Sequence, residues 1–217
     1  MQDIGMVEAS KVFKTDKSVE IAAAIASFEP FEHLLNASDI AVNTQGARGV
    51  SLLIWSLLHG NFPAMKQLLA HGADPALGDE NGHTVMHLAA KLASPEALAE
   101  LLSAGTGANL QNTKNQQTPI FDAIISDRKS QFHALIDAQA DLNAQDDMGD
   151  TPLHVAAGTG QNDYAIDLLS LGADPKLENG AGQTCRSLFF VTPLSALSDH
   201  GRLEREKIDA LLRDAGG

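Results

Sequence analysis

The chain has 217 residues, of which 44% are apolar, 20% charged and 5% aromatic, and its formal net charge is −13. This apolar fraction indicates a folded protein, because disordered chains carry fewer aliphatic residues, and the low aromatic content favours small, closely packed helices. The negative charge argues against nucleic acid and anionic membranes as partners and favours a protein with a basic surface. No apolar run approaches the roughly 20 residues that span a bilayer, so we expect no membrane insertion.

Residues 1–17 match none of the repeating units that follow and are predicted to be an N-terminal extension. The next stretch, 18–48, reads as an atypical helix pair formed by 19–27 and 31–35, because Ser18 lies 33 residues before Ser51 and keeps the phase of the later repeats. Its charged side chains suit the outer face of a terminal unit: Glu20, Glu29 and Glu32.

An internal repeat organises the rest of the chain. Hydroxyl residues recur at positions 51, 84, 118, 151 and 184, with steps of 33, 34, 33 and 33 residues. A second motif recurs with the same period, and its clearest copies read Leu-Leu followed by Gly-Ala-Asp. The Gly position of this motif lies 21 residues after each of the first four hydroxyl residues. Self-similarity at this period is the signature of a stack in which each unit completes the core of its neighbours.

The copy at 149–175 shows how each unit folds. Thr151 and Pro152 predict a helix start, because the hydroxyl caps free N–H groups and proline at the first helical position loses no hydrogen bond. A second helix follows the polar break at 158–160, and Gly172 is predicted to end it in a left-handed conformation. The residues after Gly172 supply turn chemistry for a projecting hairpin.

The phrase Gly-Asp-Thr-Pro-Leu-His-Val-Ala-Ala at 149–157 resembles the ankyrin-repeat pattern, and the resemblance covers roughly residues 18–217. It implies an all-α ankyrin-repeat solenoid of helix-turn-helix units with projecting β-hairpin loops, about four full repeats plus two atypical capping units. Leu211-Leu212 comes ten residues later than the period predicts, so we expect a longer helix-to-helix loop near 192–202. The single domain is then divided into units at about 18–48, 49–81, 82–115, 116–148, 149–181 and 182–217.

Histidines are the first candidates for a catalytic or metal-binding role. In the family, the imidazole at the position of His87 and His154 is a structural hydrogen-bonding group that links adjacent hairpins, and two other copies replace it by Ile54 and Phe121. His83 and His87 have the four-residue spacing of helical metal ligands, but His83 precedes the predicted helix. We therefore predict no metal site.

Other motifs for chemistry are also missing from the sequence. No nucleophile sits in a G-x-S-x-G elbow, and no phosphate-binding loop is recognisable. Cys185 is the single cysteine, which excludes an intramolecular disulfide and a zinc site built on several thiolates; we expect it to be a small buried side chain. We predict no catalytic residue and no cofactor, so the chain is not expected to be an enzyme.

Family members bind partners with the hairpin tips and the exposed side of the first helix of each repeat. Mapping by repeat phase selects twelve partner-binding candidates: Arg48, Leu58, Glu80, Asn81, His83, Leu92, Lys114, Ile125, Asp147, Met148, Asp150 and Gln183. Four apolar members beside the acidic ones predict an apolar centre with a charged rim, which is typical of a protein-binding face. The alternative is that a phase error of one residue buries them. Trp55 is interpreted first as packing and second as a binding hot spot.

The resemblance implies a protein–protein interaction module whose partner has a basic or mixed apolar and basic surface. The segment 49–61 is similar to a variant found in small bacterial ankyrin-repeat proteins, some of which neutralise secreted toxic enzymes encoded beside them. An immunity or inhibitor protein is therefore the alternative, and a host-directed effector is a third reading. We expect a monomer or weak dimer; cytoplasm and bacterial periplasm both remain open as its compartment.

Overall fold

A computed structural model describes residues 9–35, 42–190, 195 and 197–216. These residues form two compact units, 1–114 and 115–217, and each is described by itself. Within the described ranges the chain is helical, with only two isolated antiparallel bridges, Gln45 with Ser51 and Glu178 with Thr184. None of the helices in these ranges combines the length and apolarity that a membrane crossing requires.

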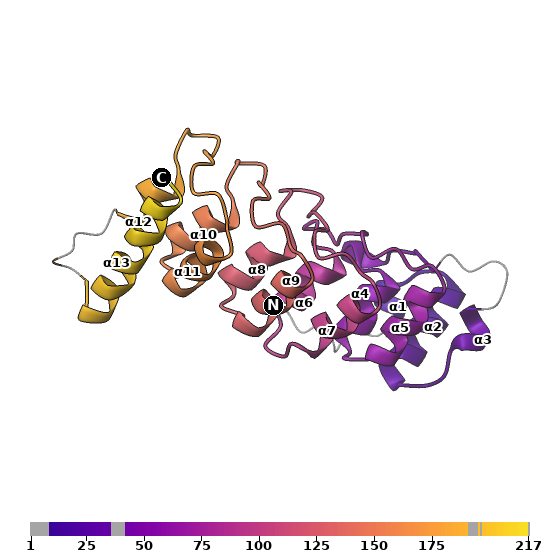
Figure 1. Cartoon of the computed structure of the whole chain (residues 1–217). Helices are drawn as coiled ribbons and strands as arrows, with labels where there is room; N and C mark the ends of the chain where they lie inside the picture. Colours follow the sequence, from indigo (N-terminus) through magenta and orange to yellow (C-terminus); the bar gives the residue numbers. More distant parts are fainter. Residues whose placement is uncertain (1–8, 36–41, 191–194, 196, 217) are drawn as a thin grey trace. The chain divides into compact units, whose positions relative to one another are not determined.

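The first unit contains the N-terminal helices α1, α2 and α3 and two complete helix pairs (Figure 1). Helix α2 packs on α4, α4 packs on α5 and α6, and α7 packs on α5 and α6. The bounds are α1 Ala9–Val12, α2 Asp16–Ser27, α3 Glu32–Leu35, the 3-10 turn η2 Ala47–Gly49, α4 Leu52–Leu58, α5 Phe62–Ala70, α6 Val85–Lys91 and α7 Glu96–Ser103.

The second unit contains two complete helix pairs and the C-terminal pair. Helix α8 packs on α9 and α10, α10 packs on α11 and α12, and the long last helix α13 packs on α11. The bounds are α8 Pro119–Ile125, α9 Lys129–Asp137, α10 Pro152–Thr159, α11 Asn162–Ser170, α12 Cys185–Phe189 and α13 Asp199–Asp214. The all-α repeat fold expected from the sequence is confirmed.

The periodic hydroxyl residues stand at helix starts, and the predicted hydroxyl cap of Thr151 is confirmed. Five of them are the N-cap residues of α4, α6, α8, α10 and α12: Ser51, Thr84, Thr118, Thr151 and Thr184. The Ser51 hydroxyl accepts the backbone N–H of Ile54, which satisfies a donor that the first helical turn leaves without a partner. Gly172 has φ of 92°, so the predicted left-handed end of the second helix is confirmed as well.

Trp55 is a core residue, as its repeat phase predicted. Its exposed fraction is 0%, and its indole N–H donates to the carbonyl of Ala22 over 2.9 Å. The Phe13 ring meets it edge-on with centroids 5.7 Å apart. Because Val12 and Phe13 are both buried, this part of the predicted extension packs on the first unit. Residues 1–8 lie outside the described residues.

The structure corrects the two ends. Helix α2 begins at Asp16, with Thr15 rather than Ser18 as its cap, because the Thr15 side chain accepts the backbone N–H of Ser18. At the other end, the loop expected near 192–202 stops at Ser198. The Ser198 hydroxyl accepts the N–H of Gly201 and caps α13, which therefore begins at Asp199, inside the range expected to be a loop. The stretches 191–194 and 196 lie outside the described residues.

Candidate protein-interaction surface

Three of the hairpin tips are each organised by one side-chain oxygen. The Asp146 Oδ1 atom accepts the backbone N–H groups of Met148 and Asp150, each over 2.9 Å. Asp79 and Asn179 bond the same two positions of their own hairpins, over 2.8–3.0 Å. Aspartate and asparagine stabilise turns in this way, so the tips are ordered before any partner arrives.

Backbone hydrogen bonds join each tip to the next within a unit. In the first unit, Glu80 N–H donates to the Arg48 carbonyl over 2.8 Å, and Thr113 N–H donates to the carbonyl of Gly82 over 3.1 Å. In the second unit, the corresponding bonds run from Asp147 to Asn115 over 2.9 Å and from Gly180 to Met148 over 2.7 Å. Every tip therefore depends on its neighbour for position.

Side chains that the sequence reasoning missed add further links between tips. The amide of Gln45 donates to the carbonyls of Gly49 and Gly78, and Gln145 makes the same pair of bonds one hundred positions later. Asn43 and Asn143 accept the N–H of Asp74 and Asp174 in the same way. The sequence did contain one signal for these residues. Gln45 and Gln145, like Asn43 and Asn143, are separated by three repeat lengths, so they occupy equivalent positions in the period set by the hydroxyl residues.

The structural interpretation of the repeat histidine is confirmed at His154. Its Nδ1 accepts the N–H of Thr151, and its Nε2 lies 2.9 Å from the carbonyl of Gln183 in the next hairpin. Through these two contacts the imidazole joins the start of its own helix to the next hairpin. His87 is fully buried and makes the same local contact with Thr84.

His83 takes part in a small polar cluster and is half-buried. Its Nε2 lies 2.8 Å from the Lys91 ammonium, and its Nδ1 lies 3.6 Å from an Asp79 carboxylate oxygen. The rings of His83 and His87 have centroids 6.2 Å apart. No group of three metal-ligating side chains occurs within the residues that the structure describes.

None of the twelve candidate residues is buried, which argues against a phase error. Eight are exposed and four are half-buried: Leu58, His83, Leu92 and Asp150. Ile125, at the end of α8, has an exposed fraction of 50%, and Met148, at a hairpin tip, has 68%. Seven candidates belong to the first unit and five to the second, so the predicted binding face consists of two sets of residues, one in each unit.

Electrostatic contacts also involve the candidates. Arg48 forms an ion pair with Glu80 across two hairpins of the first unit, and both side chains are exposed. Asp150 accepts the amide of Asn179 over 2.8 Å in the second unit. The carboxylates of Asp147 and the ammonium of Lys114 belong to exposed residues. The ion pair adds little stability, because exposed pairs typically contribute about 0–1 kcal/mol.

Two groups with perturbed pKa values have structural explanations. Burial raises the pKa of the Tyr164 hydroxyl well above its usual range, and its 2.9 Å hydrogen bond to Asp127 adds to the effect. Burial also raises the pKa of the Cys185 thiol to about 11. Cys185 is 1% exposed, which confirms the prediction that it is a small buried side chain. Neither group belongs to the candidate surface.

Comparisons with known proteins agree with the repeat. The chain is 33% identical over 145 residues to Protein PhlB of Serratia liquefaciens, which covers 67% of this chain and 64% of that protein. It is 33% identical over 139 residues to the E3 ubiquitin-protein ligase KEG of Arabidopsis thaliana, covering 61% of this chain and 8% of the ligase. The chain thus spans less than two thirds of the length of these relatives.

The fold comparison gives the same result. The crystal structure of the ankyrin repeat domain of Bcl-3, described as a unique member of the IkappaB protein family, matches with a TM-score of 0.71 and 24% identity over 89% of this chain and 81% of that one. The sequence family described as Ankyrin repeats (3 copies) matches residues 19–112 and 93–179. Ankyrin repeats imply protein–protein interaction and are typically non-catalytic. The chain belongs to the ankyrin-repeat family.

Proposed function

We propose that this chain binds another protein through its hairpin tips and the exposed ends of the first helices. The observation that carries the proposal is the exposure of Ile125 and Met148 at positions that the repeat assigns to this surface. An exposed isoleucine or methionine gains free energy when a partner removes it from water, by about 25 cal/mol for each Å² of apolar surface buried.

The tips favour binding because they are held in place in the free protein. Side-chain oxygens and tip-to-tip hydrogen bonds fix the backbone at Met148, so little conformational entropy remains to be lost on association. The exposed residue Asp147 lies beside it and adds a negative charge. A partner surface that combines apolar and basic residues complements this arrangement.

Affinity measurements on single substitutions test the proposal. Proteins retained from an extract of the source cell by the immobilised chain would be identified and purified, and Kd would be measured for each purified pair. Ile125→Arg and Met148→Arg are expected to weaken binding at least tenfold, because each places a cation where an apolar side chain meets a basic partner.

Leu171→Arg is the matched control, since Leu171 is 51% exposed but follows α11, a second helix, and lies outside the candidate surface. Its Kd is expected to stay within twofold of the wild type. Equal weakening by all three substitutions would contradict the proposed location, and failure of the wild type to bind any purified protein would contradict the function.

An immunity or inhibitor protein is the second candidate. The bacterial relative from Serratia liquefaciens and the bacterial character of the segment 49–61 favour it over a host-directed effector. An inhibitor abolishes the catalytic activity of its partner, whereas an adaptor leaves that activity unchanged. Assaying enzymes encoded beside this chain's gene, with and without the purified chain, separates the two.

A further inference from the structure

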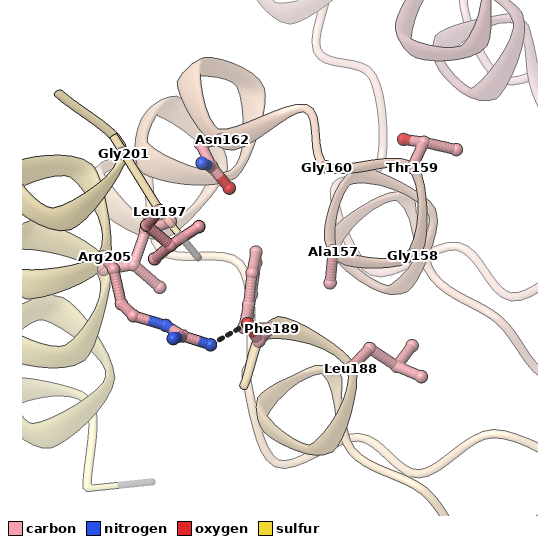
Figure 2. A pocket seen from close by; sticks show the side chains of 11 residues that line it. Ala157, Gly158, Thr159, Gly160, Asn162, Leu188, Phe189, Leu197, Gly201 and Arg205 are labelled. Carbon is pink, nitrogen blue, oxygen red and sulfur yellow. Dashed lines mark hydrogen bonds between the residues drawn. The ribbon is translucent and has the colours of Figure 1, made fainter. Parts of the chain in front are cut away.

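The second unit contains a hollow of about 550 Å³ between the end of α10, helix α12 and helix α13 (Figure 2). Phe189 stands in the middle of this region, with Leu197 and Arg205 on one side and Ala157 on the other. Its apolar lining comes from four large side chains: Leu188, Phe189, Leu197 and Ile208. Gly158 and Gly160 line the α10 side, where they contribute no side-chain atoms.

Polar side chains on the wall are already engaged within the protein. The Arg205 guanidinium donates to the Phe189 carbonyl over 2.8 Å and lies over the Phe190 ring at 4.9 Å. The amide of Asn162 donates to the Glu204 carboxylate over 2.9 Å. An occupant therefore gains most by presenting apolar surface, because the polar groups would have to give up existing bonds to receive an anion.

The repeat register explains why the space exists. Counting from the N-cap residues, Gly158 of α10 occupies the position that Leu58 has in α4 and Ile125 has in α8. A Cβ atom built on Gly158 would meet nothing within 4 Å. Helix α8 packs on α10, so one repeat presents an exposed isoleucine and the next presents a space at the same position.

We infer that this hollow is the anchor subsite of the protein-binding surface and takes an apolar side chain of the partner, of leucine to phenylalanine size, flanked by basic residues. The inference rests on the proposed function. Residues 115–217 carry 16 acidic and 8 basic side chains, which favours a basic flank. An exposed carboxylate also adjoins the hollow in sequence, because Asp163 follows Asn162, whereas Asp199, two residues before Gly201, lies 3.8 Å from the Arg202 guanidinium.

Filling the hollow from inside tests the inference. Gly158→Leu gives α10 the side chain that α4 carries at this position, and it introduces no backbone strain, since Gly158 lies outside the left-handed region and a Cβ atom there meets nothing within 4 Å. The melting temperature is expected to equal or exceed that of the wild type, because leucine is a better helix former than glycine. The binding partner would be selected from a display library of random twelve-residue peptides.

Peptides enriched on the wild type are expected to share one large apolar residue next to lysine or arginine. Their Kd is expected to rise at least tenfold on Gly158→Leu and to change less than twofold on Gly107→Leu. Gly107 is a matched control, because it is exposed, has no left-handed backbone and has nothing within 4 Å of its Cβ position.

The outcomes separate this inference from the proposed function. If peptides bind Gly158→Leu as tightly as the wild type but lose affinity on Met148→Arg, the hollow is not the subsite and the surface still binds protein. If the wild type enriches no peptide but binds the apolar dye anilinonaphthalene sulfonate, and Gly158→Leu abolishes that signal, the hollow takes a small apolar molecule and the inference is wrong.

Discussion

Asp146 is the residue whose removal most directly tests whether the tips are ordered by side-chain oxygens. Its carboxylate is 8% exposed; it accepts Met148 and Asp150 N–H groups over 2.9 Å and the Gln117 amide over 3.0 Å. Asp146→Ala removes all three bonds. Hydrogen bonds to a charged group contribute about 1.5–3 kcal/mol each, but water can replace part of them because the neighbouring residues Asp147 and Met148 are exposed, so we expect a loss of about 2–4 kcal/mol.

For a protein of this size, that loss corresponds to a decrease of about 4–16 °C in melting temperature, measured by calorimetry. Hydrogen exchange is expected to accelerate at the amides of Met148 and Asp150. Asp147→Ala is the control, because the neighbouring residue is exposed and its change is expected to stay within about 0.5 kcal/mol. Asp146→Asn should retain most of the stability, since Asn179 makes the same two backbone bonds in the next hairpin. Equal stability and exchange in Asp146→Ala and Asp147→Ala would show that the Asp146 side chain does not order the tip.

Three further predictions concern the core and the tips. Trp55→Phe should cost about 2–3 kcal/mol in urea unfolding, because it removes the indole donor to Ala22 and leaves a space; a cost below about 0.5 kcal/mol would contradict the packing role. Gly149→Ala should lower the melting temperature, because Gly149 has φ of 79° and a Cβ would lie 2.7 Å from the Gly180 nitrogen, whereas Gly107→Ala should be neutral. Because burial raises the pKa of Cys185 to about 11, its rate of alkylation in the folded protein should keep rising above pH 9, and a plateau near pH 9 would contradict the shift.

The repeat could be predicted from the sequence because short local motifs recur at a fixed spacing. A hydroxyl residue stands at the start of each first helix, and at Ser51 and Thr151 its side chain accepts an N–H three residues ahead, a bond that depends only on local sequence. The same period also predicted that Trp55 packs in the core. The N-terminal cap at Thr15 was missed, because Ser18 kept the period while the helix began three residues earlier.

Other features depend on contacts between repeats and could not be read locally. Gln45 and Gln145 bond carbonyls in the next hairpin, and no local pattern marks a glutamine for that role. The hollow beside Gly158 depends on where α13 lies against α11, which the sequence does not specify. The exposure of Met148 and Ile125 was predicted by phase alone, and its use by a partner remains a proposal.

Hydrogen–deuterium exchange of the chain with its purified partner, compared with the free chain, shows whether the hairpin tips bind that partner. We expect slower exchange at residues 147–150 and at the C-terminal ends of α8 and α10, and unchanged exchange along the second helices α9 and α11. Slower exchange confined to α9 and α11, with the hairpin tips unaffected, would contradict this expectation.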